Sequence, residues 1–244
     1  MGSNMNSSNL SILQHLSNKT SISNSSKLFR ITCKRHAATC SAYTNQSKQE
    51  SIARTSPADY NVEFQTLESC KLGISRYPDF EYNAKGGLGS GTGRKEEGAE
   101  TDDIVLVAFD IATLYIPPLT AATTKFLGLP LPPFLKIDIV PEFLQGSINR
   151  TSGKVDLQFR SKFWFSIGSI YKAPPLVVET TLTSEQSKGT TRSGSGQRMD
   201  EQGRCKLVGV AVVDPISDIL MNSFLGLPTE CIAYLNAKIS LAPV

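Results

Sequence analysis

Acid–base chemistry in this chain depends on few residue types, because both of its histidines, His15 and His36, lie within the first 48 residues. The remainder has no imidazole for a Ser–His or Cys–His nucleophile pair, for general acid–base catalysis or for a His-ligated metal site. Any such chemistry in residues 49–244 must therefore use carboxylates, Tyr, Lys or Cys.

The candidates for this chemistry are two carboxylates and two tyrosines: Asp110, Tyr115, Tyr171 and Glu179. Asp110 ends the apolar run 104–109, where burial would tune its carboxyl group for proton transfer. The alternative is that Asp110 caps the turn into residues 111–116. Glu179 falls on the polar face of an expected strand, where an ion pair across the sheet is the structural alternative.

The glycine-rich stretch 86–93 does not match a nucleotide-binding motif. Thr92 stands where a dinucleotide-binding motif needs its third glycine, and no glycine here precedes Lys and Ser or Thr as in a phosphate-binding loop. The stretch predicts either a flexible loop or a glycine-flattened strand that another backbone approaches closely.

Three cysteines lie outside the first 48 residues: Cys70, Cys205 and Cys231. They are far apart and form no CxxC pair, which argues against a zinc ribbon or a thioredoxin-type pair. Each is expected to be an ordinary buried thiol, and we expect neither a metal site nor a cofactor.

Residues 1–48 have the composition of an organelle-targeting segment. They contain no Asp or Glu, many Ser and Thr, and six scattered Lys and Arg. Polar residues interrupt every apolar run, which argues against a secretory signal, and the high Ser content favours a plastid transit peptide. The alternative is a disordered tail without a targeting role. We expect a transit peptide over 1–48, a linker over 49–59 and one domain over 60–244.

The positive net charge of the whole chain comes from this N-terminal segment. Six of the 25 Lys and Arg lie there, so the remainder has 19 basic and 22 acidic residues, a net charge of −3. Nucleic-acid binding, which needs a basic face, is therefore not expected. The longest apolar run, 104–119, is interrupted by Asp110 and by two prolines, so we expect a soluble protein or one peripheral to the thylakoid, without a membrane span.

The body of the chain has the period of β-strands. Residues 135–139 and 155–165 alternate apolar and polar side chains around a Ser–Gly turn, as does the segment 176–182, and 207–213 is apolar throughout. These patterns predict a mainly β (α+β) domain with short helices, built as a single antiparallel meander sheet or a partly closed β-barrel. Mobile loops are expected near 84–102 and 184–204.

The pentapeptide FLGLP occurs twice, at residues 126–130 and 224–228. In each copy, Gly followed by Leu-Pro is typical of a helix end, so both copies predict a short helix closed by a left-handed glycine. The surrounding stretches carry almost no charge, which indicates an apolar ligand or partner surface. Its expected residues are Phe126, Leu127, Leu129, Trp164, Phe224, Leu225 and Leu227.

Together these observations favour binding of an apolar plastid molecule (a lipid, an isoprenoid or a pigment) or of a membrane or partner surface. One alternative is a cofactor-independent isomerase or cyclase, which would place Asp110 or Glu179 inside a cavity beside Tyr115 or Tyr171. Another is an assembly factor for a photosynthetic complex, which would have an exposed apolar patch and no cavity.

Overall fold

The computed structural model describes residues 59–96 and 103–244, which form a mainly β structure. The predicted transit peptide and most of the predicted linker lie outside the described residues. The described elements are fifteen strands and one helix: β1 (Tyr60–Thr66), β2 (Cys70–Ile74), β3 (Phe80–Tyr82), β4 (Leu88–Lys95), β5 (Ile104–Phe109), β6 (Thr124–Phe126), β7 (Leu129–Pro130), β8 (Leu135–Asn149), β9 (Val155–Ile167), β10 (Tyr171–Lys172), β11 (Leu176–Thr183), β12 (Gln186–Lys188), β13 (Ser193–Ser195), β14 (Arg204–Val213), α1 (Ile219–Leu225) and β15 (Thr229–Pro243). The predicted fold class is confirmed. In the described part of the chain, no helix is long and apolar enough to cross a membrane.

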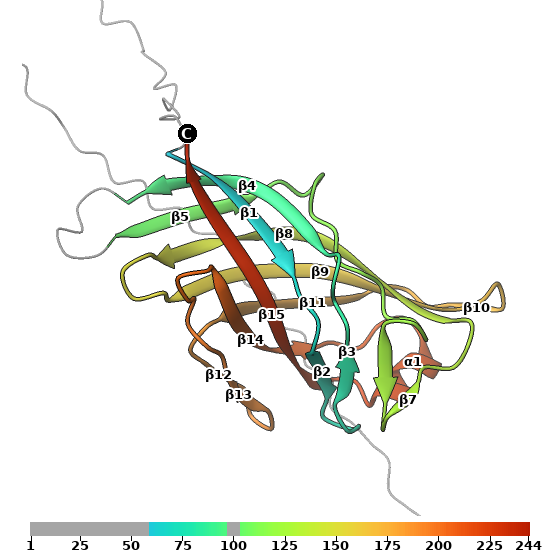
Figure 1. Cartoon of the computed structure of the whole chain (residues 1–244). Helices are drawn as coiled ribbons and strands as arrows, with labels where there is room; N and C mark the ends of the chain where they lie inside the picture. The colour runs from blue at the N-terminus through green and yellow to red at the C-terminus, as the bar shows by residue number, and fades with distance from the viewer. Residues whose placement is uncertain (1–58, 97–102) are drawn as a thin grey trace, which may run out of the picture. The chain divides into compact units, whose positions relative to one another are not determined.

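A large antiparallel sheet closes on itself through β15 (Figure 1). The order of the main strands is β1-β4-β5-β8-β9-β11-β14-β15. One edge of β15 pairs with β14, and its other edge pairs with β2 near Cys231 and with β1 from Ala237 onward. The sheet is therefore a partly closed barrel, extended at one end by β2, β3, β6 and β7.

The alternation predicted for 155–165 sets the inner and outer faces of the wall. In β9, Val155, Leu157 and Phe159 are buried inside the ring, while Gln158 is exposed and Arg160 half-buried on the outside. One half of the interior is filled by a large core cluster that includes Val62, Val105, Val107, Ile148, Leu157, Leu207 and Ile239. This filled half is the rigid base of the barrel.

Most of the glycine-rich stretch 86–93 lies in strand β4. Of the two predicted alternatives, a flexible loop or a glycine-flattened strand, the structure shows the strand. β4 pairs with β1 on one side and β5 on the other. A Cβ atom at Gly91 would collide with the carbonyl oxygen of Ala108 on β5, so only glycine allows the two backbones to come this close. The last six residues of the predicted loop, 97–102, lie outside the described residues.

The two FLGLP copies adopt different structures, and the predicted helix end is wrong for the first. Phe126 and Leu129 face each other as the last pair of the β6–β7 hairpin, and Leu127 (φ 50°) and Gly128 (φ 79°) form its two-residue turn. Two successive residues with positive φ give the primed turn that fits the twist of a hairpin. The segment becomes a strand because β3 offers an edge, on which Phe80 stacks against Phe126.

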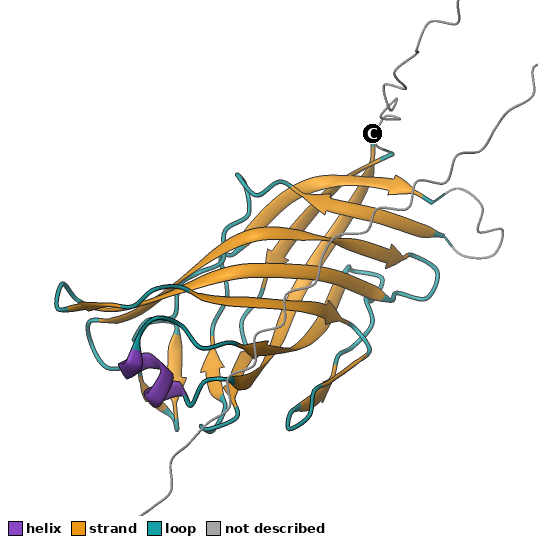
Figure 2. Ribbon diagram, turned by 180° about the vertical axis from the view of Figure 1, so that it is seen from behind, coloured by secondary structure: helices purple, strands orange, loops and turns teal. Residues whose placement is uncertain are grey.

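The second copy ends a helix, as predicted. Asp218 caps the N-terminus of α1 by accepting a hydrogen bond from the Met221 backbone N–H (2.8 Å), and Gly226 (φ 70°) ends the helix in the left-handed conformation. Figure 2 shows this helix at one end of the sheet. Met221 and Leu225 are buried against the sheet.

A small second sheet, β12–β13, covers part of the outer face of β14 and β15. It lies within the segment 184–204, for which a long loop was predicted, and it buries Val208 although this side chain points outward. The Glu230 carboxylate anchors the turn by accepting hydrogen bonds from the backbone N–H groups of Thr190 (2.5 Å), Thr191 (2.7 Å) and Arg192 (2.9 Å) and from the Thr191 hydroxyl (2.6 Å). These donors lower the pKa of Glu230 from 4.5 to about 2.

We predict that Gly128→Ala and Gly226→Ala each lower the free energy of unfolding by about 1 kcal/mol, because a residue with a Cβ atom is strained at positive φ. The space at both positions is open or in ordinary contact, so the cost is conformational. Asn, which tolerates this region, should cost less than Ala at the same positions. Urea denaturation measures all four variants, and an equal loss for Ala and Asn would contradict the assignment.

We predict that Glu230→Gln changes how stability depends on pH. Because the folded pKa of Glu230 lies below its unfolded value, its stabilisation is present above pH 4.5 and is lost as the pH falls from about 4.5 toward about 2. The variant should be less stable than the wild type near neutral pH and should approach it in acid. Denaturation midpoints across this range test the prediction, which fails if the two curves run parallel.

Candidate functional site

The half of the barrel that the base does not fill contains an apolar cavity of about 380 Å³. Its floor is formed by side chains that also belong to the packed base, among them Phe64, Leu144 and Phe159. Its wall includes inward residues of β8, β9, β11, β14 and β15: Leu135, Ile137, Ile139, Phe163, Phe165, Leu176, Val178, Leu182, Ala211, Val213, Ala233 and Leu235. The cavity is thus a continuation of the barrel core that side chains do not fill.

Small residues occupy part of the cavity wall. On β14 the inward positions continue from Leu207 in the filled base to Gly209 and Ala211 at the cavity. On β15 the corresponding residues are Ala233 and Cys231, which pair with Gly209 and Ala211. Protein interiors are normally packed without voids of this size, and alanine at positions 211 and 233 fills less of this space than a larger side chain would. At Gly209 the side chains of Leu182 and Thr180 already occupy the space that a Cβ atom would take.

Aromatic side chains surround the end of the cavity away from the base. Phe80 and Phe126 stack with their ring centroids 4.8 Å apart, and the Tyr77 ring lies 6.3 Å from Phe126 and 5.6 Å from Phe224. Phe224 also lies 6.3 Å from Phe165 on β9. We call this group, with Leu225, the aromatic rim.

The helix α1 closes a gap in the wall between β11 and β14. The ladder between these two strands consists of the single pair Thr183–Val208, and Met221 and Leu225 pack into the space beyond it. Two side chains of the β2–β3 connection hold the helix from the other side: the Tyr77 hydroxyl donates to the Phe224 carbonyl (2.7 Å), and the Arg76 guanidinium donates to the Ser223 carbonyl (2.5 Å). The helix is therefore part of the cavity wall.

The side-chain hydroxyl groups among the described lining residues all have hydrogen-bond partners. The Thr180 hydroxyl donates to the Val210 carbonyl (2.8 Å), the Tyr82 hydroxyl to Pro117, and the Tyr234 hydroxyl to Ser193 (3.4 Å). The described lining contains no Asp, Glu, Lys or Arg. A ligand in this space would meet hydrocarbon, and a buried polar group on it would stay unpaired.

Cys231 is the one cysteine among the described lining residues. Burial raises the pKa of its thiol to about 11, and burial also raises the pKa of Cys205, to about 12. Both thiols are protonated near neutral pH, so neither is an activated nucleophile.

None of the four predicted acid–base residues is among the described lining residues of the cavity. The Asp110 carboxylate accepts a hydrogen bond from the Ala112 backbone N–H (2.9 Å), which is the turn-capping alternative. Glu179 is on the outer face in an ion pair with Arg160 (3.1 Å), and the Tyr115 side chain is exposed.

The fourth, Tyr171, stabilises the start of α1. Its hydroxyl donates to the Asp218 carboxylate (2.8 Å), which is the helix cap. Burial and this hydrogen bond raise the pKa of Tyr171 to about 12, so the phenol stays protonated. The structure does not bring the four predicted residues together.

The predicted apolar surface residues separate into three groups. Phe126, Phe224 and Leu225 line the cavity, and Leu227 packs against the core beside α1. Leu127 and Leu129 are exposed at the tip of the β6–β7 hairpin. Trp164 is on the outer face of β9, where the Lys172 ammonium group lies 5.1 Å from its ring centroid.

Most of the cavity lining was not identified from the sequence. Phe163, Phe165 and Val178 were predicted as inward strand residues without a role in a site, and Tyr77 and Phe80 were not singled out. The alternation of their strands predicted that β9 and β11 residues face the interior. The pattern of one strand does not show which of its inward residues line a cavity, because this depends on the residues across the ring.

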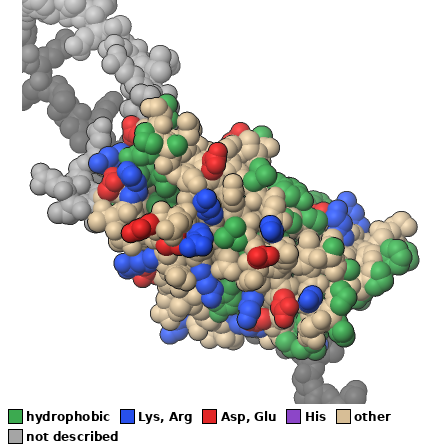
Figure 3. Space-filling view, viewed as in Figure 1, with side chains coloured by type: hydrophobic (Ala, Val, Ile, Leu, Met, Phe, Trp, Pro, Cys, Tyr) green, Lys and Arg blue, Asp and Glu red, His purple; other side chains and the backbone are tan. Residues whose placement is uncertain are grey.

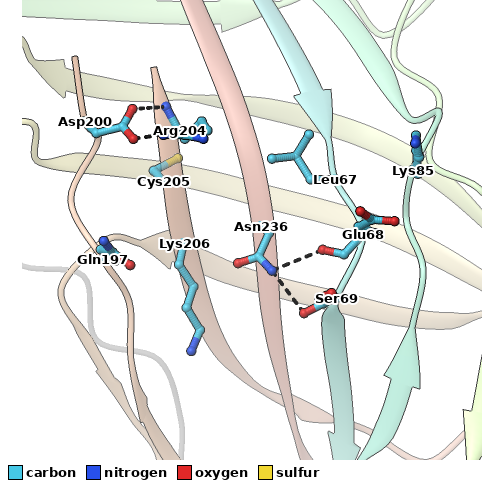
Figure 4. A pocket seen from close by; sticks show the side chains of 10 residues that line it. All are labelled: Leu67, Glu68, Ser69, Lys85, Gln197, Asp200, Arg204, Cys205, Lys206 and Asn236. Carbon is cyan, nitrogen blue, oxygen red and sulfur yellow. Dashed lines mark hydrogen bonds and ion pairs between the residues drawn. The ribbon is translucent and has the colours of Figure 1, made fainter. Parts of the chain in front are cut away.

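A second hollow of about 520 Å³ lies on the outside, between the β1–β2 corner and the start of β14 (Figure 4). Several of its polar groups have partners: Arg204 is paired with Asp200 (3.1 Å), and the Asn236 side chain donates to the carbonyls of Glu68 (3.1 Å) and Ser69 (3.0 Å). The Asn236 contacts hold the β1–β2 corner against β15. Within the ranges 59–96 and 103–244, no group of three or more His, Cys, Asp or Glu side chains is placed to hold a metal ion.

Compared with models of protein families, with curated proteins and with solved structures, the chain has no match in any of the three. The site is therefore interpreted from its own geometry.

Proposed function

We propose that the protein binds an apolar small molecule inside the barrel. The observation that supports this proposal is the lining: about 380 Å³ bounded by aliphatic and aromatic side chains whose hydroxyl groups are already engaged. Ligand-binding pockets commonly measure about 300 to 1,000 Å³, so this volume is near the lower limit. It suits a single hydrocarbon chain or a small ring system better than a two-chain lipid or a large pigment.

The positions of the carboxylates favour binding over catalysis. An isomerase or cyclase needs a proton donor or acceptor at the reacting atoms, and both Asp110 and Glu179 are engaged on the outside of the barrel. The tyrosine hydroxyl groups at the cavity donate to backbone carbonyls. A carrier or sensor of a hydrocarbon ligand needs none of these groups to be free.

The cellular setting that we propose is the plastid, with a lipid or isoprenoid as the class of ligand. The support is the composition of residues 1–48, which have no acidic residue, many hydroxyl residues and scattered basic residues.

Filling the cavity should abolish binding without unfolding the protein. Ala211→Phe places a ring in the cavity, and we expect the affinity for a fluorescent fatty-acid analogue to fall at least tenfold. The neighbouring Val212→Phe points outward from the same strand and is the control. Fluorescence titration measures affinity, and thermal melts verify folding; if Ala211→Phe does not fold, Ala233→Leu fills the same space more mildly. Unchanged affinity in a folded cavity variant would contradict the proposal.

A fusion of residues 1–55 to a fluorescent reporter tests the proposed location. We expect the reporter to accumulate in the plastids of leaf cells, because the segment lacks acidic residues and is rich in Ser. Cytosolic fluorescence would refute this part of the proposal and leave the cavity argument intact.

A further inference from the structure

Large apolar side chains are exposed around the end of the barrel that carries the aromatic rim. Apart from Val244 at the C-terminus, the six most exposed among the described residues are Ile170 (90%), Ile219 (88%), Phe134 (79%), Leu127 (71%), Leu129 (70%) and Leu220 (62%). They come from the β6–β7 turn, the segment before β8, the β9–β10 hairpin and α1. We call them the apolar tips.

Several contacts hold these four segments together. The Gly168 backbone N–H in the β9–β10 hairpin donates to the Phe134 carbonyl (2.9 Å). Tyr77 contacts Phe126 of the β6–β7 hairpin on one side and Phe224 of α1 on the other. Figure 3 shows hydrophobic side chains gathered toward this end of the molecule. The tips therefore project from one end of a single structure.

Two of the tips occupy backbone positions that do not suit their side chains. Leu127 (φ 50°) and Phe134 (φ 71°) are, with Ser69, the non-glycine residues of the described chain that have positive φ. Exposure and positive φ both favour Asn or Gly at such positions, and a bulky apolar residue there is unusual. The side chains thus add strain without adding core packing, which indicates a role outside the fold.

We propose that the apolar tips insert into the surface of a lipid bilayer and place the aromatic rim of the cavity at the membrane. This inference rests on the proposed function. Phe126 and Phe224 line the cavity and lie beside the tips. A hydrocarbon ligand would therefore pass from the bilayer to the cavity without crossing water. Separate projecting tips suit a fluid bilayer, whereas a protein partner would need a surface shaped to match them.

The charges near the tips indicate that insertion depends on apolar contact. Lys136 is paired with Asp138 (2.7 Å), and Lys125 faces Glu81 across the β3–β6 pair. Trp164, the single tryptophan of the chain, lies behind the tips on the outer face with Lys172 over its ring, a combination that suits the interfacial region of a membrane. Binding is therefore expected on neutral lipid and at high salt.

The test is flotation of the full chain with vesicles of phosphatidylcholine at low and high salt. We expect the double variant Leu127→Asn/Phe134→Asn to lose vesicle partitioning at least tenfold while melting at or above the wild-type temperature, because Asn tolerates positive φ. Leu106→Asn, on the outer face of β5 in the filled half, is the matched control and should float as the wild type does. Trp164 emission gives a second readout, with a shift to shorter wavelength expected on binding.

Several outcomes would overturn the inference. One is that the wild type fails to float with neutral vesicles, or that high salt abolishes its flotation. Another is that the double variant floats as well as the wild type. A third is that the wild type forms a dimer in vesicle-free solution that the double variant dissociates. The fatty-acid analogue is titrated in the same samples without vesicles. Intact analogue binding with failed flotation refutes membrane docking alone, whereas flotation without analogue binding refutes the proposed cavity ligand.

Discussion

The interior of a closed sheet has to be filled by side chains. In this chain the side chains fill one half of the barrel and leave a cavity in the other. Strand β15 closes the ring by pairing with β14 on one edge and with β2 and β1 on the other. In the base, residues such as Leu207 and Ile239 fill the ring completely. Toward the other end, where Ala211 on β14 and Ala233 on β15 face inward, the interior contains the apolar cavity.

The two halves of the barrel differ in what holds them. The packed base supplies buried apolar area, the main favourable term in folding, and some of its side chains also form the floor of the cavity. The hollow half is held by polar contacts on its outside, such as the Glu230 carboxylate at the β12–β13 turn and the Tyr171–Asp218 hydrogen bond at α1. The cavity can therefore stay apolar, and an apolar cavity of this kind stays dry.

The sequence predicted the strands well because one face of each must be apolar. The alternation at 155–165 predicted β9 in type and approximate extent. The run 207–213, which is apolar on both faces, predicted β14, and the structure gives the reason: β12–β13 covers the outer face of this strand. The two FLGLP copies show the limit of local reasoning. The same five residues end a helix where Asp218 caps it, and turn a hairpin where β3 offers an edge to Phe126.

The site was less predictable than the fold, for a physical reason. A cavity is defined by residues that face each other across the ring, and Ala211 and Ala233 give no local sign in the sequence that they line one. The predicted Phe126, Phe224 and Leu225 do line it, whereas Asp110 and Glu179 have local structural roles that their positions at a turn and on a polar face already suggested.

The central claim, a hydrocarbon ligand inside the barrel, is tested most directly by native mass spectrometry of the protein purified from its own cells, followed by organic extraction. The account predicts one apolar molecule per chain, carrying a single hydrocarbon chain or a small ring system and released by denaturation. Protein that carries no such molecule, or only a water-soluble one with charged groups that the lining could not pair, would contradict it.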